Sequence, residues 1–214
     1  MTVIQIIAVV ATVLCAVVFG FHFIRIVKLG APKELSEKSG NVGKGIIYSN
    51  TAAMLPHHKE SAYLHLPTYT MGIIFHIGIF IALLLYFFSF FVNFATWLSE
   101  YPWLHAILLM GFIFSASCGV ILFVKRFVMK SLRQLSHIDD FISSGLVTLF
   151  QWMTLLSLFF LHNPTVSMGY YLSAILLFIY MPIGKLKHLL YFFAARYHLG
   201  FFYGWRNVWP PKKS

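Results

Sequence analysis

The sequence predicts an all-α membrane protein with five transmembrane helices, the N-terminus outside and the C-terminus inside. Of its 214 residues, 59% are hydrophobic and only 10% are charged, whereas a soluble domain carries about 25% charged residues. The apolar residues gather into runs, and each run reaches the roughly 20 residues that cross the hydrocarbon core of a bilayer. The basic residues lie between these runs, on alternate connections.

The apolar runs set the range of each predicted helix. The first run lacks basic residues at its start and a small-residue cleavage site at its end, so we expect a retained helix rather than a signal peptide. A turn at 99–103 and an Asn-Pro break at 162–165 separate later runs. No internal repeat is visible, and one membrane domain, 1–214, is the simplest organisation. The predicted helices cover about 3–26, 68–97, 103–126, 142–161 and 168–192, the last interrupted by Pro182.

The charges predict the orientation of the chain. All 16 lysines and arginines fall in three segments, 25–59, 125–133 and 185–213. With five helices, these segments lie on one side of the membrane, and the positive-inside rule makes that side the inner one. Residues 30–66 then form an inner loop and residues 196–214 an inner tail. The net charge of +10 fits a membrane protein facing lipid headgroups and needs no nucleic acid. We expect a multi-pass protein of the cell inner membrane.

Two histidines in apolar helices are the main functional candidates, because an ionisable group inside a membrane is expensive and indicates a function. His76 lies roughly 10 Å from the inner face at 1.5 Å per residue, and His188 lies near the inner end of the last helix. Two neutral imidazoles facing each other across a helix bundle supply the axial ligands of a low-spin haem iron. The alternative is two unrelated histidines, each hydrogen-bonded locally.

Three basic residues near the inner end of the last helix are candidates for binding the propionates of such a haem. They are Lys185, Lys187 and Arg196. The alternative is that they only flank the membrane, as the positive-inside rule requires.

A second pair of histidines, His105 and His162, lies near the outer face. The pair is a candidate for a second haem or for hydrogen bonds to a quinone, and the alternative is that both are interfacial polar anchors. The sequence contains no phosphate-binding loop, nucleophile elbow or zinc motif. We therefore expect no catalytic residue acting on a soluble substrate.

Two motifs resemble a known family. Phe-His76-Ile-Gly resembles the second-helix haem motif of the gamma subunit of respiratory nitrate reductase. The segment 182–188, Pro-Ile-Gly-Lys-Leu-Lys-His, followed by Tyr191 and Arg196, resembles the fifth-helix motif of the same family. Membrane cytochrome b subunits of heterodisulfide-reductase-like complexes share this layout.

The resemblance implies an electron-transfer subunit rather than the part of the complex that reduces the substrate. It implies that His76 and His188 hold an inner haem b, while the ligand positions of an outer haem are occupied by Tyr86 and Tyr170. Tyrosine ligation is costly in an apolar site, because the phenol has a pKa near 10. We therefore expect one haem b, with aromatic side chains or a quinone in the outer half.

The function implied is transfer of electrons between membrane menaquinone or ubiquinone and a cytoplasmic iron–sulfur subunit docked on the inner face. Quinone chemistry needs a proton donor, and His105, His162, Tyr86 and Glu100 are the outer-face candidates. The alternatives are a haem-free membrane anchor and a small transporter. A transporter is disfavoured because the helices contain almost no acidic residues and no repeated halves.

Overall fold

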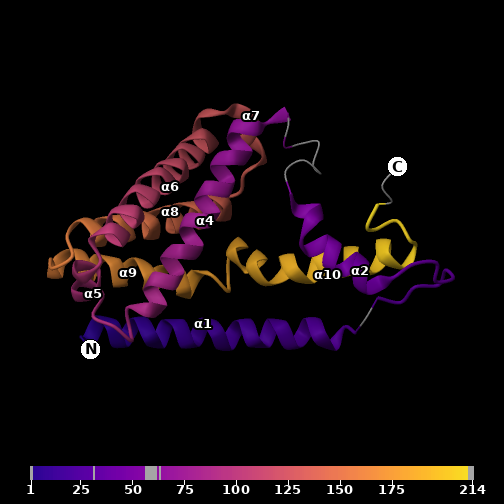
Figure 1. The fold of residues 1–214 in the computed structure, drawn as a ribbon, viewed down its shortest axis with the longest axis horizontal. Helices are drawn as coiled ribbons and strands as arrows, with labels where there is room; N and C mark the ends of the chain where they lie inside the picture. Colours follow the sequence, from indigo (N-terminus) through magenta and orange to yellow (C-terminus); the bar gives the residue numbers. More distant parts are fainter. Residues whose placement is uncertain (1, 31, 56–61, 63, 212–214) are drawn as a thin grey trace. The chain divides into compact units, whose positions relative to one another are not determined.

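The structure is a computed structural model that describes residues 2–30, 32–55, 62 and 64–211. All regular secondary structure in these residues is helical (Figure 1). Short 3-10 turns cover Ala52–Met54 and Lys185–Lys187. The α-helices are α1 (Val3–Lys28), α2 (Val42–Asn50), α4 (Leu66–Phe88), α5 (Phe94–Glu100), α6 (Pro102–Val128), α7 (Lys130–Leu135), α8 (Ile138–Phe159), α9 (Pro164–Tyr180) and α10 (His188–Trp205).

Four helices in the described residues are each long and apolar enough to cross a membrane: α1, α4, α6 and α8. A fifth span exists if α9 and the segment Lys185–Trp205 act as one broken helix. An all-helical chain with four to five such helices is compatible with a multi-pass membrane protein in contact with lipid. The prediction that the N-terminus lies outside remains a prediction.

The chain divides into two compact units. The first unit comprises Met1–Ala16 and Pro67–Leu186, and the second comprises Val17–Leu66 and Lys187–Ser214. The long helix α1 therefore contributes its first half to one unit and its second half to the other. Each unit is described by itself.

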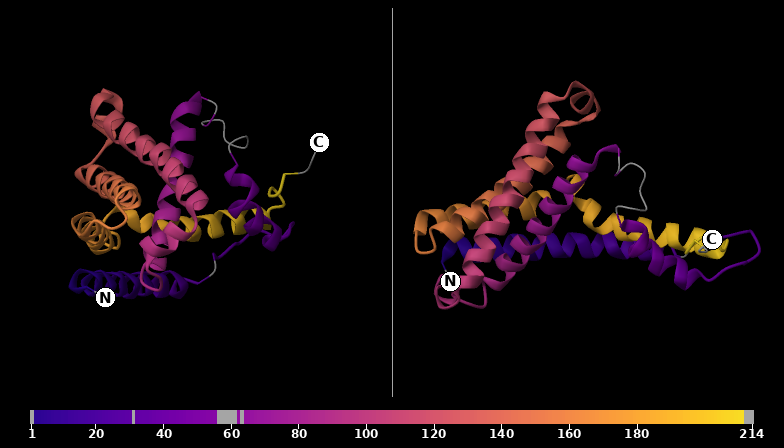
Figure 2. Two further views of the ribbon diagram at one scale, coloured as in Figure 1. Left: turned by 60° about the vertical axis from the view of Figure 1, so that its left-hand side comes forward. Right: turned by 45° about the horizontal axis from the view of Figure 1, so that its top comes forward.

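Close helix packing organises the first unit. Helix α8 lies beside α6 on one side and beside α9 on the other (Figure 2). Helix α4 approaches α6 where a Cβ atom built on Gly78 would collide with the Ser115 side chain. A Cβ atom on Gly119 would lie 2.6 Å from the Phe75 ring. Small residues at these points let the helices approach closely, which is how helices associate in lipid.

The predicted second helix is too long at its C-terminal end. Helix α4 ends at Phe88 rather than near residue 97, and Ser89 turns its hydroxyl back to the Tyr86 carbonyl at 2.7 Å. Asn93 then accepts a hydrogen bond from the Thr96 amide and starts the separate helix α5. Apolar content alone did not distinguish one helix of 30 residues from two helices because the turn between them is also apolar.

Two other predicted ranges differ at their starts. Helix α8 begins at Ile138 rather than 142, because His137 and Asp140 form a capping box at its first turn. The predicted helix 168–192 consists of α9 and part of α10, separated by the break that Pro182 predicted. The Asn-Pro break is confirmed: Asn163 caps α9, and Pro164 is its first residue.

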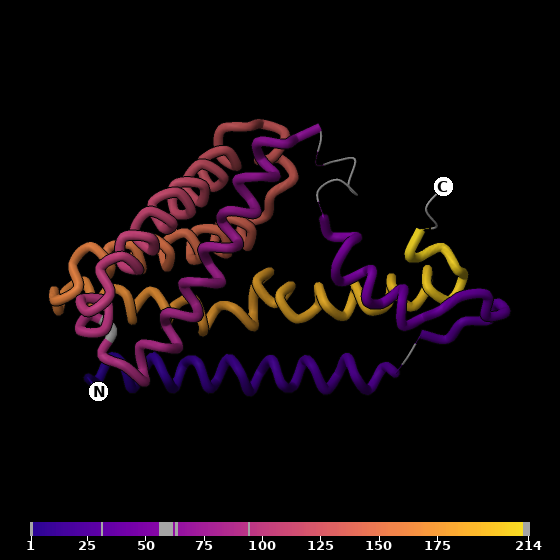
Figure 3. Tube along the Cα trace, in the orientation of Figure 1, coloured from indigo at the N-terminus to yellow at the C-terminus, as the bar shows by residue number. Residues whose placement is uncertain are grey.

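Parts of the predicted inner loop 30–66 and inner tail 196–214 are helical. Helix α2 lies within the loop, and α10 continues to Trp205 within the tail. The two helices run side by side in opposite directions in the second unit (Figure 3). The sequence prediction missed this pair because α2 has only nine residues and is too short to cross a membrane.

Glycines form the contact between α2 and α10. The buried positions recur every fourth residue on both helices, at Gly45 and Ser49 on α2 and at Gly200 and Gly204 on α10. Gly45 faces the two glycines of α10, and Ser49 faces Arg196. A Cβ atom on Gly200 would lie 2.5 Å from the Ile46 Cα atom. The segment Gly200–Gly204 is a Gly-xxx-Gly motif, which suits close contact between helix backbones.

Polar contacts close both ends of this pair. The Ser49 hydroxyl donates to the Arg196 carbonyl at 2.7 Å, and the Arg196 guanidinium donates to the Ser49 carbonyl. At the other end the Ser39 and Gly40 amides donate to the Trp205 carbonyl at 3.0 and 2.9 Å. The contacts explain how a short helix outside the long apolar runs holds a defined position.

An ion pair fixes the segment that precedes α2. Glu34 lies 2.6 Å from the Arg206 guanidinium, and the Trp205 indole N–H donates to the Ser36 carbonyl at 2.8 Å. Hydrogen bonding to Arg206, followed by that to the Ser36 amide, lowers the pKa of Glu34 below its ordinary value. Because the folded state holds the ionised form, this contribution is present above the unfolded-state pKa and is lost as pH falls through the lower folded-state pKa.

A methyl group at Gly200 should separate α2 from α10. The substitution Gly200→Ala places a Cβ atom against the α2 backbone, and we expect a cost of about 1–3 kcal/mol from overpacking. Hydrogen exchange of the α2 amides in detergent should rise accordingly. Gly43→Ala is the matched control, since its Cβ atom would lie 3.4 Å from Asn41 Oδ1, an ordinary contact distance. Equal exchange in the two variants would contradict the glycine contact.

The Glu34 ion pair should make the second unit sensitive to acid. We expect the Trp205 indole ¹H–¹⁵N resonance to shift with a midpoint below the ordinary glutamate pKa of about 4.3. In Glu34→Gln this transition should be absent, whereas Glu37→Gln should retain it because Glu37 is exposed and has no ion pair among the described residues. A transition that persists in Glu34→Gln would show that another group controls the Trp205 contact.

Candidate functional site

His76 projects from α4 with its ring exposed. Its Nδ1 atom lies 2.7 Å from the Gly72 carbonyl oxygen, one turn earlier on the same helix. A carbonyl only accepts, so Nδ1 carries the proton and Nε2 holds the lone pair. Nε2 has no hydrogen-bond partner among the described residues. This arrangement leaves one ring nitrogen oriented and available as a metal ligand.

His188 is the first residue of α10, and its side chain is also exposed. One turn further along α10, the Tyr191 hydroxyl lies 3.3 Å from Nδ1 of His22 on α1. The Tyr191 and His22 rings meet edge to face, with centroids 6.0 Å apart. Within the second unit, the start of α10 therefore contacts the second half of α1. His76 belongs to the first unit and His188 to the second.

Two of the three predicted propionate-binding residues have other partners. The Lys185 ammonium lies 2.6 Å from Asp140 of α8, which also pairs with Arg126 at 3.3 Å. The Arg196 guanidinium donates to the Ser49 carbonyl. Lys187 is exposed and has no ion pair among the described residues. Within the described part of the chain, Lys187 is therefore the one of the three that forms no ion pair or guanidinium hydrogen bond with another protein group.

The acidic partner of Lys185 belongs to a polar cluster that the sequence analysis missed. Asp139 accepts a hydrogen bond from the Tyr180 hydroxyl at the end of α9 and from Ser143 at 3.2 Å. Asp140 binds Lys185 and Arg126. The cluster joins the ends of α6, α8 and α9. The signal in the sequence was a pair of adjacent aspartates at a helix start, in a chain with only six acidic residues.

The two tyrosines at the predicted outer-ligand positions lie together in an aromatic cluster. Tyr86 and Tyr170 have ring centroids 6.2 Å apart, and Tyr170 stacks on Phe150 at 5.7 Å. Tyr86 is fully buried, and its hydroxyl donates to the Ala8 carbonyl at 3.1 Å and lies 2.8 Å from Thr12 Oγ1. The cluster comprises Tyr86, Phe87, Phe90, Phe150, Tyr170, Tyr171 and Phe178. Both tyrosines are packed as core residues.

His105 and His162 have different environments. His105 is half-buried, and its Nε2 atom donates to the Leu158 carbonyl oxygen at 2.8 Å, which joins the start of α6 to the end of α8. His162 is exposed in the connection between α8 and α9. No hydrogen bond or ring contact joins these two histidines in the part of the chain that the structure describes. His105 therefore acts as a polar link between α6 and α8. The alternative that His105 and His162 are interfacial anchors stays a prediction.

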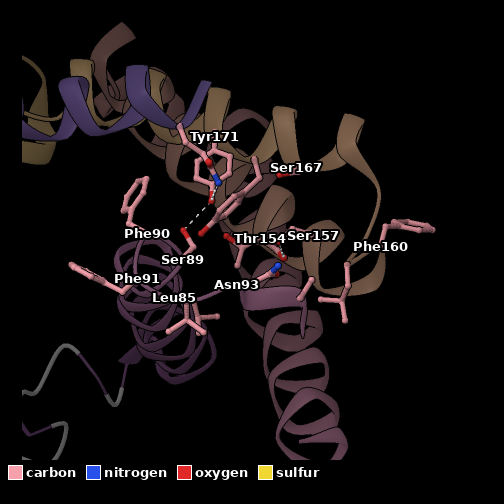
Figure 4. A pocket seen from close by; sticks show the side chains of 15 residues that line it. Leu85, Ser89, Phe90, Phe91, Asn93, Thr154, Ser157, Phe160, Ser167 and Tyr171 are labelled. Carbon is pink, nitrogen blue, oxygen red and sulfur yellow. Dashed lines mark hydrogen bonds between the residues drawn. The ribbon is translucent and has the colours of Figure 1, made fainter. Parts of the chain in front are cut away.

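A pocket of about 390 Å³ lies beside the aromatic cluster, at the end of the first unit that holds the connections after α4 and α8 (Figure 4). Its polar groups form a hydrogen-bonded row in which Gln5 donates to the Tyr171 hydroxyl and Tyr171 donates to Ser89, each at 3.1 Å. Apolar walls come from Leu85, Phe90, Phe91 and Phe160, and further polar groups come from Asn93, Thr154, Ser157 and Ser167.

This pocket combines aromatic walls with about as many polar as apolar side chains, so its chemistry suits a ring that carries hydrogen-bonding groups. Its phenol and hydroxyl groups can donate to the carbonyl oxygens of a flat ring, and the aromatic side chains can contact its faces. The sequence analysis named Tyr86 for an outer site but did not find this pocket. Its residues come from α1, the segment after α4, and α8 and α9, and no local motif connects them.

The fold places this chain among all-helical proteins with four to five helices that are long and apolar enough to cross a membrane. No protein-family model, no curated protein and no solved structure matches this chain. Among the described residues, no group of three or more histidine, cysteine or acidic side chains is arranged to hold a metal ion. A haem iron needs only two axial side chains, so two histidines can bind haem without forming a group of three ligands.

Proposed function

We propose that this chain is a cytochrome b-type membrane subunit of a respiratory oxidoreductase complex. It passes electrons between the quinone pool and a cytoplasmic iron–sulfur subunit, and it binds one haem b through His76 and His188. The proposal extends the resemblance to the gamma subunit of respiratory nitrate reductase. The substrate-reducing site belongs to another subunit.

The geometry of His76 is the observation that carries the proposal. Its Nδ1–H bond to the Gly72 carbonyl fixes the ring and leaves the Nε2 lone pair available. Histidines that bind metals commonly donate their other ring N–H to a backbone carbonyl in this way. His188, at the start of α10, is exposed and supplies the second ligand. When bound, the haem supplies one-electron transfer, and the protein contributes its ligands and an apolar environment.

The packing around Tyr86 and Tyr170 supports a single haem. These positions carry histidines in the two-haem relatives that the sequence resembles. Here both rings are packed against other aromatic rings, and the Tyr86 hydroxyl is bonded to α1. A flat macrocycle would have to displace that cluster. The outer half of the bundle is therefore assigned to aromatic packing and to quinone.

The pocket beside Tyr171 is the proposed quinone site. The ring of menaquinone or ubiquinone would lie against its aromatic walls, and the Tyr171 hydroxyl, which otherwise donates to Ser89, would donate to a carbonyl oxygen of the quinone instead. A hydroxyl row also offers a path for the protons that accompany quinone reduction. The basic residues of the proposed inner face would attract an acidic iron–sulfur subunit.

A haem-free membrane anchor is the second candidate function. The partners of Lys185 and Arg196 favour it, because both cations are already bound to protein groups rather than available to propionates. Such an anchor would use the same helices and the same inner face to hold its partner subunits.

Removal of either proposed ligand should abolish normal haem binding. We expect His76→Ala and His188→Ala, purified in mild detergent, to lose the six-coordinate low-spin spectrum and most of their haem. His198→Ala is the control, because His198 lies half-buried on α10 and is not a proposed ligand. If both alanine variants keep a normal low-spin spectrum, the assignment of the ligands is wrong.

Loss of the Tyr171 hydroxyl should impair the quinone step and leave haem content unchanged. The hydroxyl is one hydrogen-bonding group, worth about 0.5–1.5 kcal/mol. In Tyr171→Phe we therefore expect the quinol concentration for half-maximal haem reduction to rise about 2- to 12-fold. Tyr101→Phe, which removes an exposed hydroxyl, is the matched control. An unchanged quinol dependence in Tyr171→Phe would place the quinone elsewhere.

A further inference from the structure

A group of polar side chains lies in the core of the first unit, where α4, α6 and α8 meet. Gln151 of α8 is fully buried, Ser115 of α6 is 2% exposed and Thr148 of α8 is 7% exposed. All three lie within helices long and apolar enough to cross a membrane. Backbone and side-chain polar groups at such a depth have no access to bulk water and must be satisfied within the protein.

The hydrogen bonds of Gln151 fix the orientation of its amide. Its Nε2 atom donates to the Phe75 carbonyl of α4 at 2.9 Å and to the Ser115 hydroxyl of α6 at 3.0 Å. Both amide hydrogens are therefore used. The reversed amide would place Oε1 against the Phe75 carbonyl, where two acceptors would face each other. The Gln151 oxygen must therefore point away from α4.

Two polar atoms remain without a partner at this position. Gln151 Oε1 is a buried acceptor with no hydrogen bond among the described residues, and Thr148 Oγ1 is a buried hydroxyl with none. The two residues are three positions apart on α8, so they lie on the same side of the helix with Cβ atoms about 5–6 Å apart. That separation can be bridged by one small molecule.

Helix α6 presents only backbone to Thr148 at this point. A Cβ atom built on Gly119 of α6 would lie 3.3 Å from Thr148 Oγ1, but the Phe75 ring approaches the same point to 2.6 Å. Because that ring fills the space a side chain at Gly119 would take, a molecule that bridges the two unpartnered atoms must lie along α8 and be as small as water. Buried waters occupy polar sites of this kind and make two to four hydrogen bonds.

We propose that a water molecule binds in the core of the first unit, bridging Gln151 Oε1 and Thr148 Oγ1. The water donates to the Gln151 oxygen and pairs with the Thr148 hydroxyl. With the water bound, hydrogen bonds connect the Phe75 carbonyl of α4, the Gln151 side chain and the Thr148 hydroxyl of α8. Phe75 directly precedes His76 in the chain, so this site stabilises the helical turn that carries the proposed haem ligand. The water site itself does not depend on haem.

Two measurements on the full chain in detergent test the site. The first is the infrared carbonyl band of Gln151 in protein labelled with ¹³C at the glutamine side-chain carbonyl. The chain has three glutamines, and subtraction of Gln151→Leu identifies the band. The second is magnetisation transfer from water to the Gln151 side-chain amide protons, with Ser115→Ala included to exclude transfer through the Ser115 hydroxyl.

We expect the wild-type band at the lower wavenumber of a hydrogen-bonded carbonyl, with a water signal that survives in Ser115→Ala. In Thr148→Val, which keeps the side-chain shape, the band should move to higher wavenumber and the water signal should be lost. Thr154→Val is the matched control and should change neither, because the Thr154 hydroxyl already donates to the Phe150 carbonyl at 2.8 Å.

Three results would overturn the proposal. They are a wild-type band at the position of a free carbonyl, a band that does not respond to Thr148→Val, and a hydrogen-bonded band with no water signal. The last result would mean that Thr148 donates directly to Gln151. Circular dichroism of each variant verifies that the helices are retained.

Discussion

The first unit depends on the satisfaction of polar groups inside helices that are long and apolar enough to cross a membrane. Lipid tails are as apolar as leucine, so burial of hydrocarbon does not by itself drive helices together, and association relies on close packing and interhelical hydrogen bonds. Hydrogen bonds from Gln151, Tyr86 and His105 each join different helices here. Gln151 binds α4 and α6, Tyr86 binds the Ala8 carbonyl of α1, and His105 binds the Leu158 carbonyl of α8. Each side chain pairs with a backbone or hydroxyl group of another helix.

The second unit uses backbone contact in place of long apolar packing. Helix α2 has only nine residues, and isolated helices of that length are marginal in water. Glycines on α2 and α10 allow the two backbones to touch, and Ser49 and Arg196 exchange hydrogen bonds at one end of the contact. The Glu34–Arg206 pair and the Trp205 carbonyl hold the preceding segment at the other end. This unit carries His188, so its packing governs one proposed ligand.

The long apolar helices could be predicted from the sequence because length and hydropathy are local properties. The break before α9 was equally clear from Asn163 and Pro164, although the predicted helix began at 168 rather than at Pro164. The end of α4 was not, because the turn after Phe88 is built from apolar residues and is marked only by Ser89 and Asn93. The α2–α10 pair and the pocket beside Tyr171 join residues far apart in the chain, and no local pattern could locate them. The roles of Lys185 and Arg196 also depended on distant partners, Asp140 and Ser49.

The proposed binding of one haem b per chain by His76 and His188 is open to a direct measurement, a pyridine hemochrome assay on the purified wild-type protein, with the protein quantified by amino-acid analysis. We expect one haem b per chain and the reduced-minus-oxidised spectrum of a six-coordinate low-spin cytochrome b. Absence of haem from protein purified gently from native membranes would contradict the proposed function and favour the haem-free anchor. Two haems per chain would contradict the assignment of Tyr86 and Tyr170 to aromatic packing.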